Sequence, residues 1–527
     1  MAEVGTAPQP QTHTSHSWMA VRNVLSNWGA YGLSIVITFF LSPFVVHRLG
    51  DAAYGVWVLI ASLTGYLGLL DMGVRAAVTR YIPKFHTQGE HEESSRIVSS
   101  ALALFAAAGL IAILLCCSVA FFALQYLHIP MHLWNGARIV LVLAGVSVAL
   151  SLISGVFGGV VIGLQRFDLY NGVGTAAFVL RSVAIVLVLL HGYGLVALAV
   201  VQLSYALVSL AVNMLTSIRL YPELRPALSL ATRTHLKTIF SFSVYAFALN
   251  VFSYVILYTD SLVIAAMLPV SLVTFFSIAA NLVSYARQLV GGITTTVGPL
   301  ASRLEASGDS KNLQEVTLTT SRYAGTLVMT IFFTFLMRGG TFIGLWMGKS
   351  YVELSGRILV ILGFGFAISA QVAVAWAVMF GIGKHKALVP AYLAESLTNL
   401  VLSILLVRAI GVTGTAWGTT IPSVMVCLLF WPWYVRRTLH IPMRSYAANT
   451  WVRPAIACIP FVICTYVFMR WTTPSNVYVF FLQTGVALIA GAVGFWIVCV
   501  SAADRKAYME RIRRLLDRTP SRLIANS

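Results

Sequence analysis

Long apolar runs follow one another along this chain, separated by short polar connections. A helix needs roughly 20 consecutive apolar residues to cross the hydrocarbon core of a bilayer. The runs that we assign to such helices are 21–47, 53–80, 96–126, 137–164, 170–191, 194–218, 237–267, 271–300, 319–346, 355–382, 388–409, 412–435, 451–470 and 476–500. A membrane β-barrel is not favoured, because its strands are roughly ten-residue alternating segments. The sequence therefore predicts an all-α polytopic membrane protein with about fourteen transmembrane helices.

Composition agrees with this fold class and explains the strong positive charge. Of the 527 residues, 58% are hydrophobic and 10% are charged, whereas soluble proteins carry about 25% charged residues. The net charge is +18, but the basic residues lie mostly between the apolar runs. With the N-terminus in the cytoplasm, about 25 of the 35 Lys and Arg residues fall on the cytoplasmic side. We therefore expect a multi-pass inner (plasma) membrane protein with both termini cytoplasmic, and no nucleic-acid partner.

The remaining segments are short and polar. Residues 1–20 are expected to form a disordered cytoplasmic tail, and residues 219–236 a cytoplasmic linker. Residues 501–527 are basic with apolar residues at helical spacing, which predicts an amphipathic helix on the anionic membrane surface. All six cysteines lie inside apolar runs without metal-ligand spacing. We interpret them as packing residues and expect no metal site.

Short internal matches indicate a repeat. The matched positions are Tyr66 with Tyr285, Gly163 with Gly381, and Gly194 with Gly411, at offsets of 219, 218 and 217. A nearly constant offset predicts two copies of a six-helix bundle, an N-terminal lobe at 21–218 and a C-terminal lobe at 237–435, followed by two extra helices at 451–500. Because each copy has an even number of spans, the pseudo-two-fold axis is expected along the membrane normal. Without a nucleotide-binding motif, such a duplication predicts a secondary transporter or a flippase rather than an enzyme.

Ionisable residues inside the spans are candidate functional residues, since each costs at least about 2.5–3.5 kcal/mol at mid-bilayer. They are Asp71, Arg75, Arg181, Asp260, Arg287, Arg338 and Glu395. Arg181 and Arg287 fall near mid-span and have no acidic residue three or four positions away. A guanidinium presents a fork of donors that suits phosphate oxygens. We expect both arginines to contact substrate phosphate, the alternative being a bond to a carbonyl or a carboxylate of another helix.

The other charged residues support two interpretations each. Asp71 and Arg75, four positions apart, are expected on one helix face. They form either a neutralised structural pair or a gated pair, with Arg75 then binding substrate and Asp71 coupling ions. Arg338 lies in the outer third of its span and either binds substrate or extends toward the interface. Asp260 and Glu395 are candidates for carrying a coupling H+ or Na+, and we expect no other cofactor.

Several segments resemble the bacterial polysaccharide flippases, the Wzx-like and PST-type members of the multidrug/oligosaccharidyl-lipid/polysaccharide exporter superfamily. These segments are Asn27–Tyr31, Pro43–Gly50, Tyr54–Trp57, Leu69–Gly73, Arg80–Tyr81 and Phe342–Gly348. The resemblance implies translocation of undecaprenyl-pyrophosphate-linked oligosaccharide from the cytoplasmic to the periplasmic leaflet, for O-antigen, capsule or exopolysaccharide. It also implies alternating access, an ion gradient as driving force, a cationic lumen that fits Arg181 and Arg287, and a polysaccharide polymerase and export machinery as partners.

Other functions make different demands on the chain. A cation-coupled multidrug or metabolite antiporter of the same superfamily needs a cavity dominated by acidic and aromatic residues. A membrane glycan polymerase or ligase needs sizeable outer loops, and the outer connections predicted here are short. A non-transporting lipid-binding or scaffold protein of the same fold would have no charge facing a common cavity.

Overall fold

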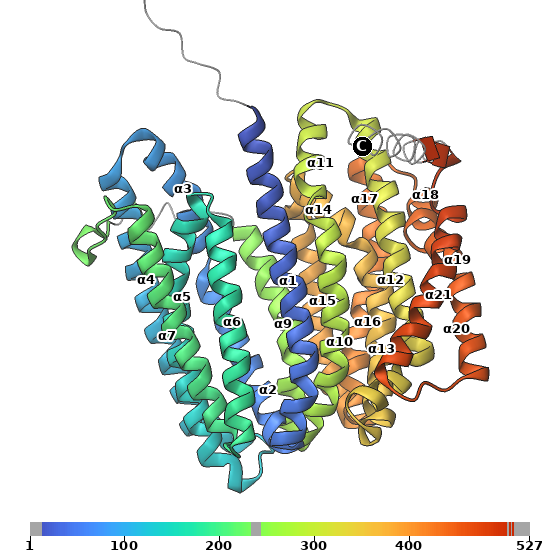
Figure 1. Cartoon of the computed structure of the whole chain (residues 1–527), viewed down its shortest axis with the longest axis horizontal. Coiled ribbons are helices and arrows are strands. Elements are labelled where there is room, and N and C mark those ends of the chain that lie inside the picture. Colours follow the sequence, from blue (N-terminus) through green and yellow to red (C-terminus); the bar gives the residue numbers. More distant parts are fainter. Residues whose placement is uncertain (1–12, 233–234, 236–243, 503–504, 507–508, 511–527) are drawn as a thin grey trace, which may run out of the picture. The chain divides into compact units, whose positions relative to one another are not determined.

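The computed structural model describes residues 13–232, 235, 244–502, 505–506 and 509–510 (Figure 1). Within these residues, every regular element is a helix. Thirteen helical segments in the described part of the chain are long and apolar enough to cross a membrane. A further helix of 24 residues, Ser271–Thr294, is more polar and carries Arg287. The predicted all-α membrane fold with about fourteen spans is therefore confirmed.

The chain divides into two compact units, residues 1–247 and 248–527. The helices of unit 1 are α1 (His13–Leu49), α2 (Asp51–Tyr66), α3 (Val74–Gln88), α4 (His91–Ser118), α5 (Trp134–Gly163), α6 (Phe167–Leu190) and α7 (Leu195–Leu220). α5 packs against both α4 and α7, and α6 packs against α1 (Figure 1).

Unit 2 has the same order of spans with two more at its end. Its helices are α9 (Val244–Met267), which begins at the end of unit 1, α10 (Ser271–Thr294), α11 (Val297–Ala306), α12 (Ser310–Trp346), α13 (Val352–Ser369), α14 (Ala373–Gly381), α15 (Val389–Ile410), α16 (Thr413–Met425), α17 (Trp431–Leu439), α18 (Met443–Ala447), α19 (Arg453–Ala457), α20 (Ile459–Trp471) and α21 (Val477–Val498). α20 and α21 pack against each other and against α12 (Figure 1).

The N-terminal helix starts earlier than the sequence suggested. α1 begins at His13, so residues 13–20 of the expected disordered tail are helical. Neither glycine nor proline occurs between Pro10 and Gly29, so the backbone offers no obstacle to extending the helix. Residues 1–12 lie outside the described residues, as does most of the predicted basic tail at 501–527.

The second span of each unit is interrupted. In unit 1 the sequence predicted a single helix over 53–80, but a 3₁₀ turn at Leu67–Asp71 separates α2 from α3. Met72 and Gly73 follow with φ angles of 43° and 79°, and residues in this left-handed region end a helix. In unit 2, residues 295–296 separate α10 from α11.

A matched glycine holds the second half of this interrupted span in each unit. A β-carbon at Gly163, the last residue of α5, would lie 3.3 Å from the carbonyl oxygen of Thr79 on α3. A β-carbon at Gly381, the last residue of α14, would overlap the carbonyl oxygen of Gly298 on α11. The repeat inferred from these glycines therefore has a physical basis inside each unit, since a side chain at Gly381 would overlap the backbone of α11 and one at Gly163 would be crowded by α3. The axis relating the two copies stays a prediction.

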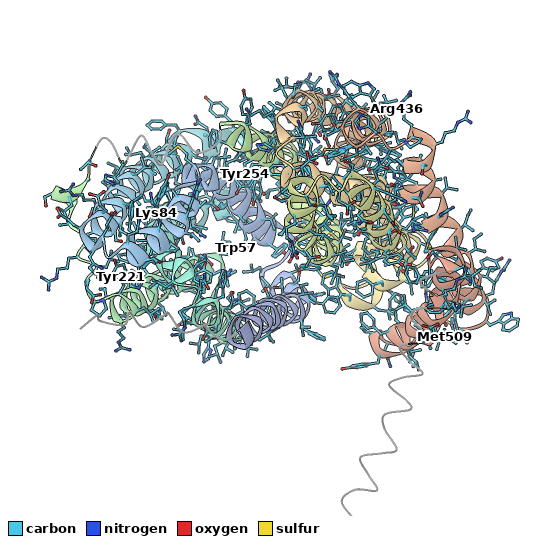
Figure 2. All side chains as sticks on the ribbon, turned by 90° about the horizontal axis from the view of Figure 1, so that it is seen from above. Trp57, Lys84, Tyr221, Tyr254, Arg436 and Met509 are labelled. Atoms are coloured by element: carbon cyan, nitrogen blue, oxygen red, sulfur yellow. The ribbon has the colours of Figure 1, made fainter. Side chains whose placement is uncertain are left out.

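Serine side chains of α4 bind the connection that follows α7. Three of their hydroxyls accept hydrogen bonds from its backbone N–H groups, namely Ser95 from Arg225 at 3.1 Å, Ser99 from Ala227 at 3.0 Å and Ser100 from Thr232 at 3.2 Å. The fully buried Tyr221, labelled in Figure 2, hydrogen-bonds Ser94 at 3.1 Å. Residues 221–232 of the predicted linker are thus attached to α4, while residues 219 and 220 belong to α7.

Candidate functional site

A cavity of about 230 Å³ in unit 1, which we call the Arg181 pocket, lies among α2, α5, α6 and α7. Its polar lining consists of Thr64, Ser147, Ser151, Arg181 and Gln202. Trp57, labelled in Figure 2, is among its apolar lining residues. None of the residues that line this pocket is acidic, so its net charge is positive.

Arg181 has few internal partners for its guanidinium. Its charged group lies 5.5 Å from the ring centroid of Tyr205, a cation–π contact. Within the described part of the chain, the buried Nε of Arg181 and the buried Oε1 of Gln202 have no hydrogen-bond partner. Buried polar atoms of this kind cost free energy unless a ligand or water satisfies them. The unpartnered Nε of Arg181 is a donor suited to an anion, whereas the unpartnered Oε1 of Gln202 is an acceptor suited to a hydroxyl group or water.

A second cavity, of about 380 Å³ and called here the Arg287 pocket, lies inside unit 2. Its charged lining residues are Asp260 from α9, Arg287 from α10 and Glu395 from α15. Arg287 donates a hydrogen bond from Nη2 to Ser369 Oγ at 3.0 Å, and its charge interacts with that of Glu395. Ser423 hydrogen-bonds the carboxylate of Glu395. Structure thus brings together three of the residues selected from sequence.

Oxygen atoms surround the buried Asp260. Thr419 donates a hydrogen bond to Oδ2 of Asp260 at 2.6 Å, and Ser403 donates to Oδ1 at 3.3 Å. Asn399, itself fully buried, donates from Nδ2 to Thr419 Oγ1 at 2.8 Å, and its Oδ1 atom has no partner among the described residues. A carboxylate, two hydroxyls and a free amide oxygen are ligands that hard cations prefer.

Two glycines four residues apart bring this cluster together. β-Carbons at Gly414 and Gly418 on α16 would overlap the backbone of Leu406 and the hydroxyl of Ser403 on α15, respectively. Glycine spacing of this kind lets two membrane helices approach at backbone distance. Thr419 follows Gly418 directly, so the close approach sets its position relative to Asn399 and Ser403.

A comparison with protein families decides the assignment. Residues 20–305, just over half of the chain, match the family model described as "Polysaccharide biosynthesis protein". The chain belongs to this family. Asp71, Arg75, Arg181, Asp260 and Arg287 all lie within the matched residues, and the resemblance inferred from the sequence is confirmed.

Two named relatives share nearly their full length with this polysaccharide biosynthesis protein. One is the "Uncharacterized membrane protein EpsK" of Bacillus subtilis, 20% identical over 93% of this chain and 98% of the relative. The other is a "Putative O-antigen transporter" of Shigella flexneri, 22% identical over 79% of this chain and 98% of the relative.

Solved structures of transporters have the same fold. The lipid II flippase MurJ in an inward closed conformation superimposes with a TM-score of 0.70 at 13% identity, covering 90% of this chain and 98% of MurJ. A multidrug resistance transporter of the MATE family, in its inward-facing conformation, gives a TM-score of 0.64 at 13% identity, with 77% and 94% coverage. Identities this low establish the fold alone.

The sequence placed Asp71 and Arg75 on one face of a continuous helix, but Asp71 lies in the break at residues 67–73 and Arg75 in the first turn of α3. They still interact, since Arg75 Nε lies 3.6 Å from Asp71 Oδ2 and the Arg75 backbone N–H donates to Oδ1 at 3.3 Å. Asp71 thereby satisfies an N–H group in the first turn of α3. On α5, a β-carbon at Gly155 would lie 2.6 Å from Arg75 Nη2. These contacts fit the structural interpretation of the pair.

Arg338 lies away from both pockets. It is buried on α12, where Nη2 donates to Gln483 Oε1 on α21 at 2.6 Å and the guanidinium lies 4.8 Å from the ring centroid of Phe480. Gln483 in turn donates to Thr472 at 3.1 Å. The geometry favours a role in attaching α21 to α12 over contact with substrate.

Several residues in or beside the two pockets were missed by the sequence analysis. Tyr392, Thr419 and Ser423 line the Arg287 pocket, whereas Tyr205 and Ser403 contact the pocket residues Arg181 and Asp260. Serine, threonine and tyrosine are common in membrane helices, so composition alone does not single them out. The Gly414-x-x-x-Gly418 spacing is the one sequence signal that points to the close contact between α15 and α16.

Proposed function

We propose that this protein is a flippase that moves undecaprenyl-pyrophosphate-linked oligosaccharide from the cytoplasmic to the periplasmic leaflet of the bacterial inner membrane by alternating access. One observation carries the proposal: each unit has a cavity lined by an arginine that lies near the middle of a membrane span. The named relative with an assigned transport role is a putative O-antigen transporter, and the fold is that of a lipid II flippase. Both termini are cytoplasmic in this proposal.

The chemistry of the two pockets suits a diphosphate. Hydrogen bonds from a charged donor contribute about 1.5–3 kcal/mol each, and a guanidinium binds phosphate oxygens in a bidentate manner. Arg181, without an acidic neighbour in its pocket, replaces part of the water that the phosphate loses. Arg287 contributes in the same way from the second unit. Because the protein must also release its substrate, the two access states need similar affinities for it.

The ion that drives the cycle is proposed to bind at Asp260. The carboxylate with Ser403, Thr419 and the amide oxygen of Asn399 forms an oxygen-rich cluster that suits either a proton on the carboxyl group or a bound Na+. Glu395, in the same pocket, is proposed as the second acidic group of the coupling site. The sequence has no nucleotide-binding motif, so an ion gradient is proposed as the energy source in place of nucleotide hydrolysis.

Reconstitution tests the substrate assignment. Vesicles containing the purified protein and a fluorescent undecaprenyl-diphosphate oligosaccharide would be treated with a membrane-impermeant quencher, so that the protected fraction reports flipping. Arg181→Ala and Arg287→Ala are expected to reduce the rate at least tenfold. Arg470→Ala serves as the control, because Arg470 is exposed at the end of α20 and contacts Tyr466 at 5.9 Å from its ring centroid. Wild-type rates in both pocket variants would refute phosphate binding by these arginines.

The same vesicles distinguish the coupling ion and the antiporter alternative. A pH gradient without Na+ and a Na+ gradient at uniform pH are imposed separately, and Asp260→Asn is expected to abolish the response to whichever gradient accelerates flipping. A protein that exports cationic dyes against either gradient and leaves the lipid-linked glycan in place would instead be an antiporter. That alternative has some support in the MATE-like fold.

A further inference from the structure

Unit 1 contains a second cavity, of about 490 Å³, which we call the Tyr170 pocket. Its polar lining residues include Tyr170 and Thr175 from α6 and Tyr205, Ser209 and Asn213 from α7. No Asp, Glu, Lys or Arg is among its lining residues. The pocket therefore combines aromatic rings with hydroxyl and amide groups and carries no net charge.

The Tyr170 pocket adjoins the Arg181 pocket at a contact between one lining residue of each. Tyr205 lines the former, and its ring centroid lies 5.5 Å from the guanidinium of Arg181, which lines the latter. A ligand that places an anionic group on Arg181 would therefore have its neighbouring atoms next to Tyr205. In a sugar diphosphate, the first sugar is joined directly to phosphorus through its anomeric oxygen, so a sugar site must adjoin the phosphate site.

The lining groups are held in fixed positions. A β-carbon at Gly158 on α5 would lie 2.8 Å from Cε2 of Tyr170, so this glycine provides the space that the ring occupies. Asn213 donates from Nδ2 to Ser154 Oγ at 3.0 Å and to Ser209 Oγ at 3.4 Å. These bonds use the amide nitrogen and leave the carbonyl oxygen to accept from a ligand. Rigid aromatic rings and oriented amides bind neutral polar groups with little loss of conformational freedom.

We propose that the Tyr170 pocket binds the first sugar of the transported molecule while Arg181 binds the adjoining phosphate. The inference rests on the proposed function and adds to it a place for the glycan within unit 1. Sugar rings present hydroxyls at their edges and C–H groups on their faces, which match the amide, hydroxyl and aromatic groups of this pocket. A polyprenyl chain offers no partner for them, and a second phosphate would find no cation there.

Space-filling substitutions on α6 test the pocket. A β-carbon at either Gly174 or Gly172 would meet no atom within 4 Å, but only Gly174 lines the Tyr170 pocket. The purified full-length protein would be titrated calorimetrically in detergent with farnesyl diphosphate and with farnesyl diphosphate carrying glucose, galactose or N-acetylglucosamine. At least one sugar-bearing probe is expected to bind wild type about tenfold more tightly than farnesyl diphosphate, which corresponds to about 1.4 kcal/mol.

Gly174→Leu is expected to bind the sugar-bearing probes no more tightly than farnesyl diphosphate, whose affinity stays at the wild-type value. Gly172→Leu is expected to keep the tenfold preference for the sugar-bearing probe. Asn213→Ala, which leaves the pocket open, should lower the preference severalfold. Its control, Ser204→Ala, lies on the same helix and removes only a hydroxyl bonded to Val200 O at 2.9 Å. Arg181→Ala should weaken every probe equally.

The outcomes separate this inference from the proposed function. If the reconstituted protein flips lipid-linked glycan but no sugar improves probe binding, or if Gly174→Leu retains the sugar preference, the Tyr170 pocket is not the sugar site and the flippase proposal stands. If Gly174→Leu weakens farnesyl diphosphate as strongly as its sugar-bearing forms, the pocket assignment also fails. If the protein neither flips the glycan nor binds any diphosphate probe, both proposals fail together.

Discussion

Replacing Gly418 with alanine is expected to separate α15 from α16 and to disrupt the oxygen cluster at Asp260. A β-carbon at Gly418 would lie 2.6 Å from both Cα and N of Ser403. Non-bonded carbon atoms pack at about 3.5–4.0 Å. The two helices must therefore move apart by roughly 0.9 Å at this crossing to accommodate a single methyl group.

The displacement acts directly on a neighbouring hydrogen bond. Thr419 follows Gly418, and its Oγ1 accepts from Asn399 Nδ2 at 2.8 Å across the same interface. A shift of roughly 0.9 Å would lengthen this bond to about 3.7 Å, beyond the range of about 2.7–3.2 Å for N–H···O bonds. Overpacking of this size costs about 1–3 kcal/mol, and loss of the bond adds about 1 kcal/mol. The free energy of unfolding should fall by roughly 2–4 kcal/mol.

Thermal unfolding in detergent, followed by tryptophan fluorescence, measures this effect. The melting temperature of Gly418→Ala should fall, and any stabilisation of wild type by Na+ should be lost, because ligands of the proposed ion site no longer meet. Gly485→Ala is the matched control, since Gly485 is also helical and a β-carbon there would meet no atom within 4 Å. A Gly418→Ala protein with the melting temperature and ion response of wild type would show that the close crossing does not support the cluster.

Three further perturbations test other contacts. Arg338→Leu leaves the Oε1 atom of its partner on α21 unsatisfied and should lower the melting temperature, while the flipping rate per folded molecule stays at the wild-type value; a selective loss of flipping would instead indicate substrate contact. Ser99→Ala removes the acceptor of the Ala227 N–H group, so hydrogen–deuterium exchange of that amide should accelerate at least tenfold, and unchanged exchange would mean that the serine does not hold the connection. Asp71→Ala should destabilise the protein by about 0.5–1 kcal/mol in chemical unfolding, because a part-exposed ion pair and a backbone hydrogen bond with Arg75 are lost. Asp71→Asn should recover most of the lost stability. Equal loss of transport in both variants would instead favour a gated pair.

The number of spans and the repeat were predictable because both follow from long-range physical constraints. Apolar length alone fixes whether a segment crosses a bilayer, and short connections force successive helices to be neighbours. Gly163 and Gly381 match in the sequence repeat, and both lie where a neighbouring helix leaves little or no room for a side chain. Arg181 and Arg287 were identified for a related reason, because a guanidinium in mid-span must find a polar environment.

The details of the pockets were not predictable from one sequence. Ser403 and Thr419 are 143 and 159 residues from Asp260 in the chain, and such distant partners leave no local pattern. The break in the second span was also missed, since Met72 adopts a left-handed backbone that its side chain does not favour. Arg338 shows the opposite error, because a buried guanidinium that hydrogen-bonds Gln483 on another helix cannot be told from a ligand-binding one by its position in a span.

The charges of the two arginine pockets differ in a way that bears on ion coupling in the proposed flippase. None of the described residues that line the Arg181 pocket is acidic, so in the proposed flippase its affinity for an anion would not depend on a titrating or ion-binding neighbour. The Arg287 pocket contains two carboxylates, Asp260 and Glu395, which oppose anion binding when they are charged and unoccupied. A proton or Na+ bound there would raise the affinity of unit 2 for phosphate, and its departure would lower it. Ion movement would then control phosphate release in unit 2, whereas unit 1 would bind the substrate in the same way throughout the cycle.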